Sequence, residues 1–122
     1  MRNLVRVLNL ALCLTLVFGA MGCSTNTRPR VSTEDATGIT ATSANLNGDL
    51  TLTGGKPVVD VSFEWGMTPH QFPNETAAVA RWYTGPFSSR VAGLHSHTAY
   101  YYRTKAVGDS TSYGSEMSFI TP

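Results

Sequence analysis

The sequence predicts an all-β domain, an antiparallel two-sheet sandwich, preceded by a short N-terminal signal helix. Apolar and polar residues alternate with period two in several short runs, and no stretch after residue 30 has the apolar spacing of an amphipathic helix. Turn residues separate these runs at intervals of about 8 to 12 residues, which is typical of a sandwich. The signal helix is predicted by a basic and then apolar N-terminus.

The N-terminal segment has the order of a secretory signal peptide. Residues 1–6 include two arginines and no acidic side chain, and residues 7–21 are mostly apolar. This apolar stretch is shorter than the roughly 20 residues that a membrane-spanning helix needs. Because small residues follow it, as they do before a signal-peptidase site, we predict a signal peptide over residues 1–22.

The end of this leader resembles the lipobox of bacterial lipoproteins. Gly22, Cys23 and Ser24 match the pattern, whereas Ala20 and Met21 differ from its most frequent residues. The resemblance implies cleavage after Gly22, a lipid on the Cys23 sulfur and a tether over residues 23–30. The alternative is an ordinary secretory signal with an incidental cysteine. Lipidation is favoured because it removes an exposed, unpaired thiol from a secreted protein.

Charge and cysteine content exclude several classes of function. The chain has nine basic and eight acidic side chains, and two of the basic ones lie in the leader, so the mature chain has seven and a formal net charge of −1. Such a domain lacks the basic surface that nucleic acid requires. Both cysteines, Cys13 and Cys23, precede the domain, which excludes a disulfide framework and a cysteine-based zinc site.

The predicted strands follow one another from residue 31 to residue 122. In the first clear run, Leu46 and Leu50 alternate with Asn47 and Asp49, so one face suits a core and the other suits water. The same alternation recurs in the later runs. The runs are Ser43 to Leu52, Val59 to Trp65, Phe87 to Val91, Tyr100 to Ala106 and Met117 to Phe119. Their separators contain Gly, Pro, Asn, Asp and Ser, the residues that favour turns.

The segment from Leu94 to Val107 resembles the E–F corner and F strand of fibronectin type III domains. A Leu is followed four residues on by Thr and six on by Tyr, and the strand closes with Ala-Val. The other strands occur in the family's order over residues 31–122. The resemblance implies a seven-stranded Greek-key sandwich in which Tyr100, after Leu94, forms a tyrosine corner with the backbone of the preceding turn.

No residue pattern indicates catalysis or a metal site. His95 and His97 form a His-x-His pair, but no third ligand accompanies them, so an exposed corner turn is the favoured interpretation. The chain has no Gly-x-Ser-x-Gly motif. We therefore expect a non-enzyme that uses no cofactor.

Outward-facing charges and aromatic residues are the remaining candidates for a binding surface. Arg103 and Lys105 point away from the core if Tyr100 and Tyr102 point inward. The family topology implies that Glu64 and Glu116 flank this basic row and form cross-strand pairs. Solvated charge pairing is favoured over a binding face.

Two aromatic residues and two loops are weaker candidates. For Trp82 and Tyr83, sheet-edge packing is the favoured interpretation; the alternative is that, in a strand, one is buried and the other is exposed as a stacking platform for sugar or peptide. Loops Thr53 to Pro57 and Gly108 to Ser112 lie at one end of a sandwich of this family. Their candidate binding residues are Lys56, Asp109 and Ser110.

The sequence therefore predicts a non-catalytic lipoprotein of the bacterial cell envelope. It presents one fibronectin type III-like interaction module at the outer face of a membrane, and a secreted protein is the alternative. The expected partners are the membrane, through the lipid on Cys23, and an unidentified protein or carbohydrate. A passive spacer, or an accessory module of a larger extracellular protein or hydrolase, is the other functional alternative.

Overall fold

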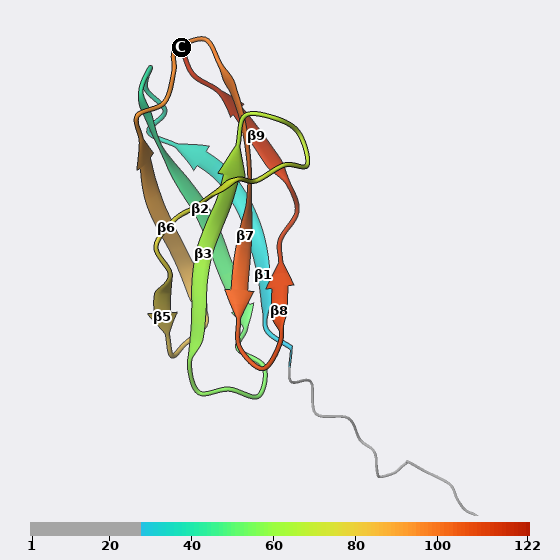
Figure 1. Cartoon of the computed structure of the whole chain (residues 1–122). Coiled ribbons are helices and arrows are strands. Elements are labelled where there is room, and N and C mark those ends of the chain that lie inside the picture. The colour runs from blue at the N-terminus through green and yellow to red at the C-terminus, as the bar shows by residue number, and fades with distance from the viewer. Residues whose placement is uncertain (1–27) are drawn as a thin grey trace, which may run out of the picture.

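The computed structural model describes residues 28–122. The predicted signal helix, the cleavage site at Gly22 and Cys23 lie outside the described residues. Within residues 28–122 every regular element is a β-strand, and this region has no helix that could cross a membrane. Two antiparallel sheets face each other, as Figure 1 shows. The all-β sandwich that the sequence predicts is therefore confirmed.

The strands divide between the two sheets in the order expected for a Greek-key sandwich. One sheet contains β1 (Arg30–Thr37), β2 (Ser43–Leu52) and β6 (Gly85–Ala92), in that order. The other sheet is centred on a pair, β3 (Val59–Gly66) and β7 (Ala99–Val107). Outside this pair lie β4 (Asn74–Glu75), β5 (Val79–Arg81), β8 (Thr111–Tyr113) and β9 (Met117–Ile120).

The nine strands of the described region occupy seven strand positions. Both β4 and β5 pair with β3, and both β8 and β9 pair with β7. Between β4 and β5, the hydroxyl of Thr76 takes the place of a backbone carbonyl and accepts the N–H of Phe63 at 3.0 Å. Between β8 and β9, the N–H of Gly114 donates to the carbonyl of Thr104 at 3.0 Å. Each outer position is thus one broken strand.

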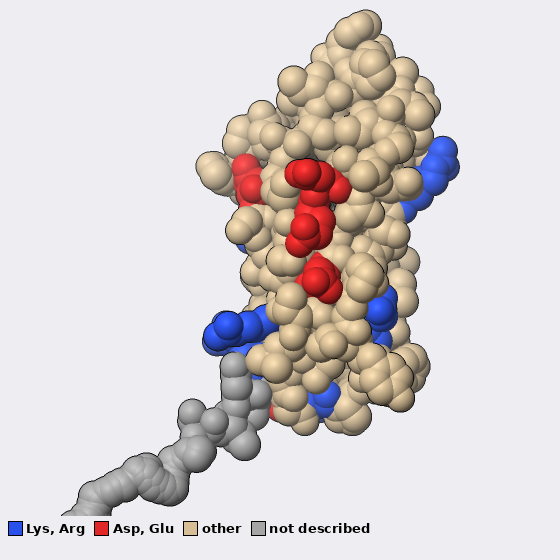
Figure 2. All heavy atoms as spheres, turned by 180° about the vertical axis from the view of Figure 1, so that it is seen from behind, with Lys and Arg blue, Asp and Glu red and all other residues tan. Residues whose placement is uncertain are grey.

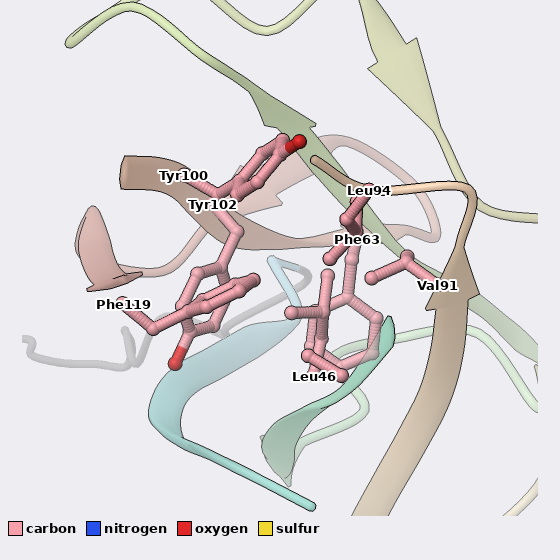
Figure 3. Close-up of a cluster of buried hydrophobic side chains, with 8 residues drawn as sticks. Leu46, Phe63, Val91, Leu94, Tyr100, Tyr102 and Phe119 are labelled. Atoms are coloured by element: carbon pink, nitrogen blue, oxygen red, sulfur yellow. The ribbon is translucent and has the colours of Figure 1, made fainter. Parts of the chain in front are cut away.

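The core of the described residues lies between the sheets. Figure 3 shows side chains from both sheets converging on it. Tyr100 stacks on Phe119 with ring centroids 5.6 Å apart, and the partly buried Trp65 packs against Tyr100 at 6.0 Å. The larger cluster consists of Ala44, Leu46, Phe63, Val91, Leu94, Tyr100, Tyr102 and Phe119. A smaller cluster of described residues, Leu50, Val59, Val61 and Ala106, extends the core.

The two sheets approach each other closely at Gly48 of β2. A Cβ atom at this position would overlap the methyl group of the buried Thr104 and lie 3.0 Å from the ring of Phe87. The Thr104 hydroxyl also lies 3.1 Å from the hydroxyl of Thr33 in β1, within hydrogen-bond distance. Glycine is therefore required at position 48 for the sheets to pack at this spacing.

The chain enters the sandwich slightly earlier than the sequence predicts. Arg30 begins β1, and Pro29 is already buried, so the last two residues of the predicted tether belong to the folded domain. Arg30 lies opposite Leu52, the last residue of β2. The entry point is therefore at the same end of the sandwich as the β2–β3 and β7–β8 loops (Figure 1).

Candidate binding surface

The turn before β7 is held by the backbone of His95. The hydroxyl of Tyr100 accepts a hydrogen bond from the N–H of His95 at 2.7 Å, and the hydroxyl of Thr121 donates to the His95 carbonyl at 2.6 Å. Leu94 is buried, and its N–H donates to the carbonyl of Thr42, in the connection between β1 and β2, at 2.9 Å. These contacts fix the turn between β6 and β7 through its main chain.

The two histidines of this turn have no metal-binding surroundings. His95 and His97 are both exposed, and His97 has a left-handed backbone conformation with φ of 51°. Among residues 28–122 no group of three or more His, Cys, Asp or Glu side chains could hold a metal ion.

Arg103 is the centre of the outward face of β7. Glu64 lies directly opposite on β3, and its Oε1 accepts from the Arg103 Nε at 2.9 Å and lies 2.8 Å from Nη2. The guanidinium also lies over the ring of Tyr113, 3.8 Å from its centroid, and 4.7 Å from that of Phe72. The predicted Glu64 pair is therefore present, and two aromatic rings lie within cation–π distance of the guanidinium.

The second predicted pair, between Glu116 and this basic row, is wrong. The Glu116 carboxylate accepts the N–H of His70 at 2.9 Å and lies 3.0 Å from His70 Nδ1. Glu116 lies in the break between β8 and β9, because β9 begins only at Met117. A residue in this break has no strand partner on β7 and can turn towards the β3–β4 loop.

The carboxylate of Glu75 in β4 pairs with Lys105, a contact that the sequence does not predict. Its Oε1 lies 3.3 Å from the Nζ of Lys105, and its Oε2 accepts from the hydroxyl of Ser62 at 2.8 Å. Burial disfavours the charged ammonium, but the hydrogen bond and charge of Glu75, together with Glu64, outweigh it and raise the pKa of Lys105. The basic row is thus neutralised by carboxylates of its own sheet.

Trp82 and Tyr83 do not form the buried and exposed pair that the sequence predicts. The two residues are 61% and 80% exposed, respectively. Strand β5 ends at Arg81, so both aromatics lie in the bend before β6, where alternation no longer determines which way a side chain points. Neither side chain is therefore buried at the sheet edge.

The predicted binding loops lie next to each other. Lys56 Nζ of the β2–β3 loop lies 3.8 Å from Asp109 Oδ1 of the β7–β8 loop, and both side chains are substantially exposed. The backbone of Ser110 accepts the N–H of Gly108 at 3.0 Å and closes the second loop. These residues form a small polar surface at one end of the sandwich, beside an open pocket of about 420 Å³ that is lined by Lys56, Pro57, Val58, Asp60, Val107 and Gly108.

Comparisons with known proteins identify the fold. No protein-family model and no curated protein sequence matches this chain. Among solved structures, the sensor domain of the anti-sigma factor RsgI4 from Pseudobacteroides cellulosolvens is similar with a TM-score of 0.63 and 20% identity, over 77% of this chain and 75% of that one. A second structure of that sensor domain has a TM-score of 0.60 and 21% identity, over 77% of this chain and 89% of that one.

A human protein shares the same sandwich. The fibronectin type III domain of human fibronectin type III domain containing protein 3 is similar with a TM-score of 0.50 and 17% identity, over 84% of this chain and 92% of that one. At such identities the likeness defines the fold alone. The described domain is a fibronectin type III-like β-sandwich.

Proposed function

We propose that this protein is a bacterial cell-envelope lipoprotein that presents a single interaction module at the outer face of a membrane. The observation that carries the proposal is the position of Gly22 and Cys23 immediately before the folded domain, whose first buried residue is Pro29. A diacylglyceryl group on Cys23 would provide two acyl chains, which are enough for stable anchoring. The leader then directs export, and the sandwich is the functional part.

A binding role, rather than a catalytic one, is supported by the surface. The charged groups that converge on the outer face of β7, including Arg103 and Lys105, are paired with Glu64 and Glu75. The similar solved domains are a sensor domain and a fibronectin type III domain, which suits a module that recognises a partner.

The role of Cys23 can be tested by replacing it in the full chain. We expect the unaltered chain in the membrane fraction, resistant to high salt and released by detergent, because a lipid rather than a charged surface holds it. Cys23→Ala should move most of the protein to the soluble extracytoplasmic fraction. Cys13→Ala is the matched control and should stay with the membrane. Equal membrane retention of the Cys23 and Cys13 variants would contradict the proposal.

A further inference from the structure

Three loops share the end of the sandwich at which the chain enters. Leu52 lies opposite Arg30, Arg81 lies opposite Val59, and Val107 lies opposite Asp60, so the loops that follow Leu52, Arg81 and Val107 all lie at this end. Figure 1 shows the same arrangement. We call this surface the tether end and define it as residues 28–30, 53–60, 81–85 and 107–110.

The tether end carries two large aromatic side chains that the fold leaves uncovered. Trp82 and Tyr83 are among the most exposed large apolar residues of the described chain. Exposed aromatic side chains do not provide the stabilisation that they would provide if they were buried in a core. Trp and Tyr are the residues enriched at membrane–water interfaces, where an apolar ring and a polar atom can both be accommodated.

The charge of the tether end has the opposite sign to that of the rest of the domain. It contains four basic residues and two acidic ones, a formal charge of +2, whereas the rest of residues 28–122 has three basic and six acidic ones, a charge of −3. Figure 2 shows basic side chains close to the point where the chain enters and acidic side chains in a column above them. The basic residues are Arg28, Arg30, Lys56 and Arg81, and the acidic ones are Asp60 and Asp109.

The length of the linking segment holds this end close to any lipid on Cys23. Five residue steps separate Cys23 from Arg28, which is a reach of at most about 18 Å. Strand β2 alone, with ten residues, spans roughly 33 Å along the sandwich. A tether shorter than the domain gives the tether end a high effective concentration at the lipid surface, so that weak contacts suffice.

We propose that the tether end is a membrane-contacting face. Its basic residues bind anionic lipid headgroups, while Trp82 and Tyr83 enter the interfacial layer, a setting that rests on the lipid anchor proposed above. Each Lys or Arg near an anionic membrane surface adds to the attraction, and the attraction falls with salt. Lys56, Asp109 and Ser110 then face lipid, and a macromolecular partner is left with the opposite end and the sides of the sandwich.

The test attaches the mature chain to vesicles chemically, so that it does not depend on natural lipidation. In residues 23–122 the single cysteine is Cys23, which can be coupled to a maleimide lipid in vesicles of phosphatidylcholine and phosphatidylglycerol. Quenching of tryptophan by spin-labelled lipids with the label near the headgroup then reports how close the indole lies to the membrane. This chain contains all the described residues of the sandwich, 28–122.

The control moves the exposed tryptophan to the opposite end. Ile120 is 69% exposed and lies opposite Ala99, at the start of β7 and far from the tether end. We expect the unaltered chain to show several-fold stronger quenching than the Trp82→Phe, Ile120→Trp variant, with Trp65 common to both. Equal quenching in the two chains, or stronger quenching in the variant, would overturn the proposal.

Charge is tested on the same coupled chain. Quenching of Trp82 should be stronger on vesicles with phosphatidylglycerol than on pure phosphatidylcholine, and Arg30→Gln with Lys56→Gln should remove most of that difference. Arg90→Gln, outside the tether end, should retain it. Equal quenching on both lipids would refute the headgroup contact, whereas an unmodified Cys23 in cells would refute only the natural anchor.

Discussion

Tyr100 and Tyr102 illustrate how a single residue can serve both the core and the backbone. Both side chains are buried, and both hydroxyls reach main-chain groups outside their own strand. Tyr100 accepts from the His95 N–H, and Tyr102 donates to the Glu34 carbonyl at 2.6 Å. The alternation of apolar and polar residues predicts that these rings point inward, but the identity of the backbone partner of Tyr102 depends on how β1 crosses β7.

Removing the Tyr100 hydroxyl should destabilise the domain modestly. Tyr100→Phe leaves the His95 N–H without its partner while it retains the ring packing, so we expect a loss of about 1 kcal/mol in the free energy of unfolding. Urea denaturation measures it. Tyr101→Phe, on the other face of the same strand, is the control and should change little. No loss for Tyr100→Phe would show that the corner contact contributes nothing to stability.

Tyr102 should make the domain sensitive to alkaline pH. The pKa of Tyr102 is raised from 10.0 to about 12, and burial of the phenol is the largest cause of this shift. The folded state therefore keeps the phenol proton after the unfolded chain has lost it, so this contribution to stability is complete below pH 10 and is lost as pH rises towards 12. Against the effect of burial, the hydrogen bond and charge of Glu75 also raise the pKa of Lys105, so the comparison requires a chain that lacks only the phenol.

The measurement compares urea denaturation of the unaltered chain and Tyr102→Phe at pH 9 and pH 11.5. Over this pH interval the free energy of unfolding of the unaltered chain should fall by about 2 kcal/mol more than that of the variant, as a rise of about two in the pKa of Tyr102 implies. Lys105 is present in both chains, and its contribution cancels. An equal loss in the two chains would contradict the assigned effect of burial.

At the scale of elements, the predicted runs cover β2, β3, β6, β7 and β9, but they miss β1 and the shortest strands. The run from Ser43 to Leu52 coincides with β2, and the run from Tyr100 to Ala106 differs from β7 by one residue at each end. Strands β4, β5 and β8 have two or three residues, too few for a period of two to be recognised.

The errors at the candidate site have the same origin. Because β4 could not be recognised, Glu75 was missed as the partner of Lys105. Because the last strand position is broken before Met117, Glu116 was assigned to the wrong partner. Trp82 and Tyr83 were placed in a strand that ends one residue before them. Alternation describes residues within a strand and carries no information on where an outer strand stops.

The close approach of β2 to β7 predicts a strong effect of one methyl group. Gly48→Ala should destabilise the domain by about 1 to 3 kcal/mol, because Thr104 and the Phe87 ring leave no room for a Cβ atom. Gly108→Ala is the matched control, since its Cβ would meet Pro29 and Val59 only at 3.6 Å. Thermal or urea unfolding distinguishes them, and equal stability of the two variants would show that the sheets can separate at Gly48.

At the scale of the whole molecule, the described residues 28–122 form a two-sheet sandwich with its core between the sheets. The fibronectin type III-like fold could be predicted from the Leu94 to Val107 segment and the strand order, and the similar solved structures agree with it. The distribution of charged and aromatic residues between the two ends of the sandwich could not be predicted from the sequence, because it depends on which loops the fold brings together around the entry point.

The most direct test of the account is the mass of the N-terminal peptide of the mature protein in the membrane fraction. Trypsin should release a peptide that begins at Cys23 and ends at Arg30, because Pro29 blocks cleavage after Arg28. We expect this peptide to carry a diacylglyceryl group on the Cys23 sulfur. A peptide that begins after residue 23, or an unmodified Cys23 at the mature N-terminus, would contradict the account.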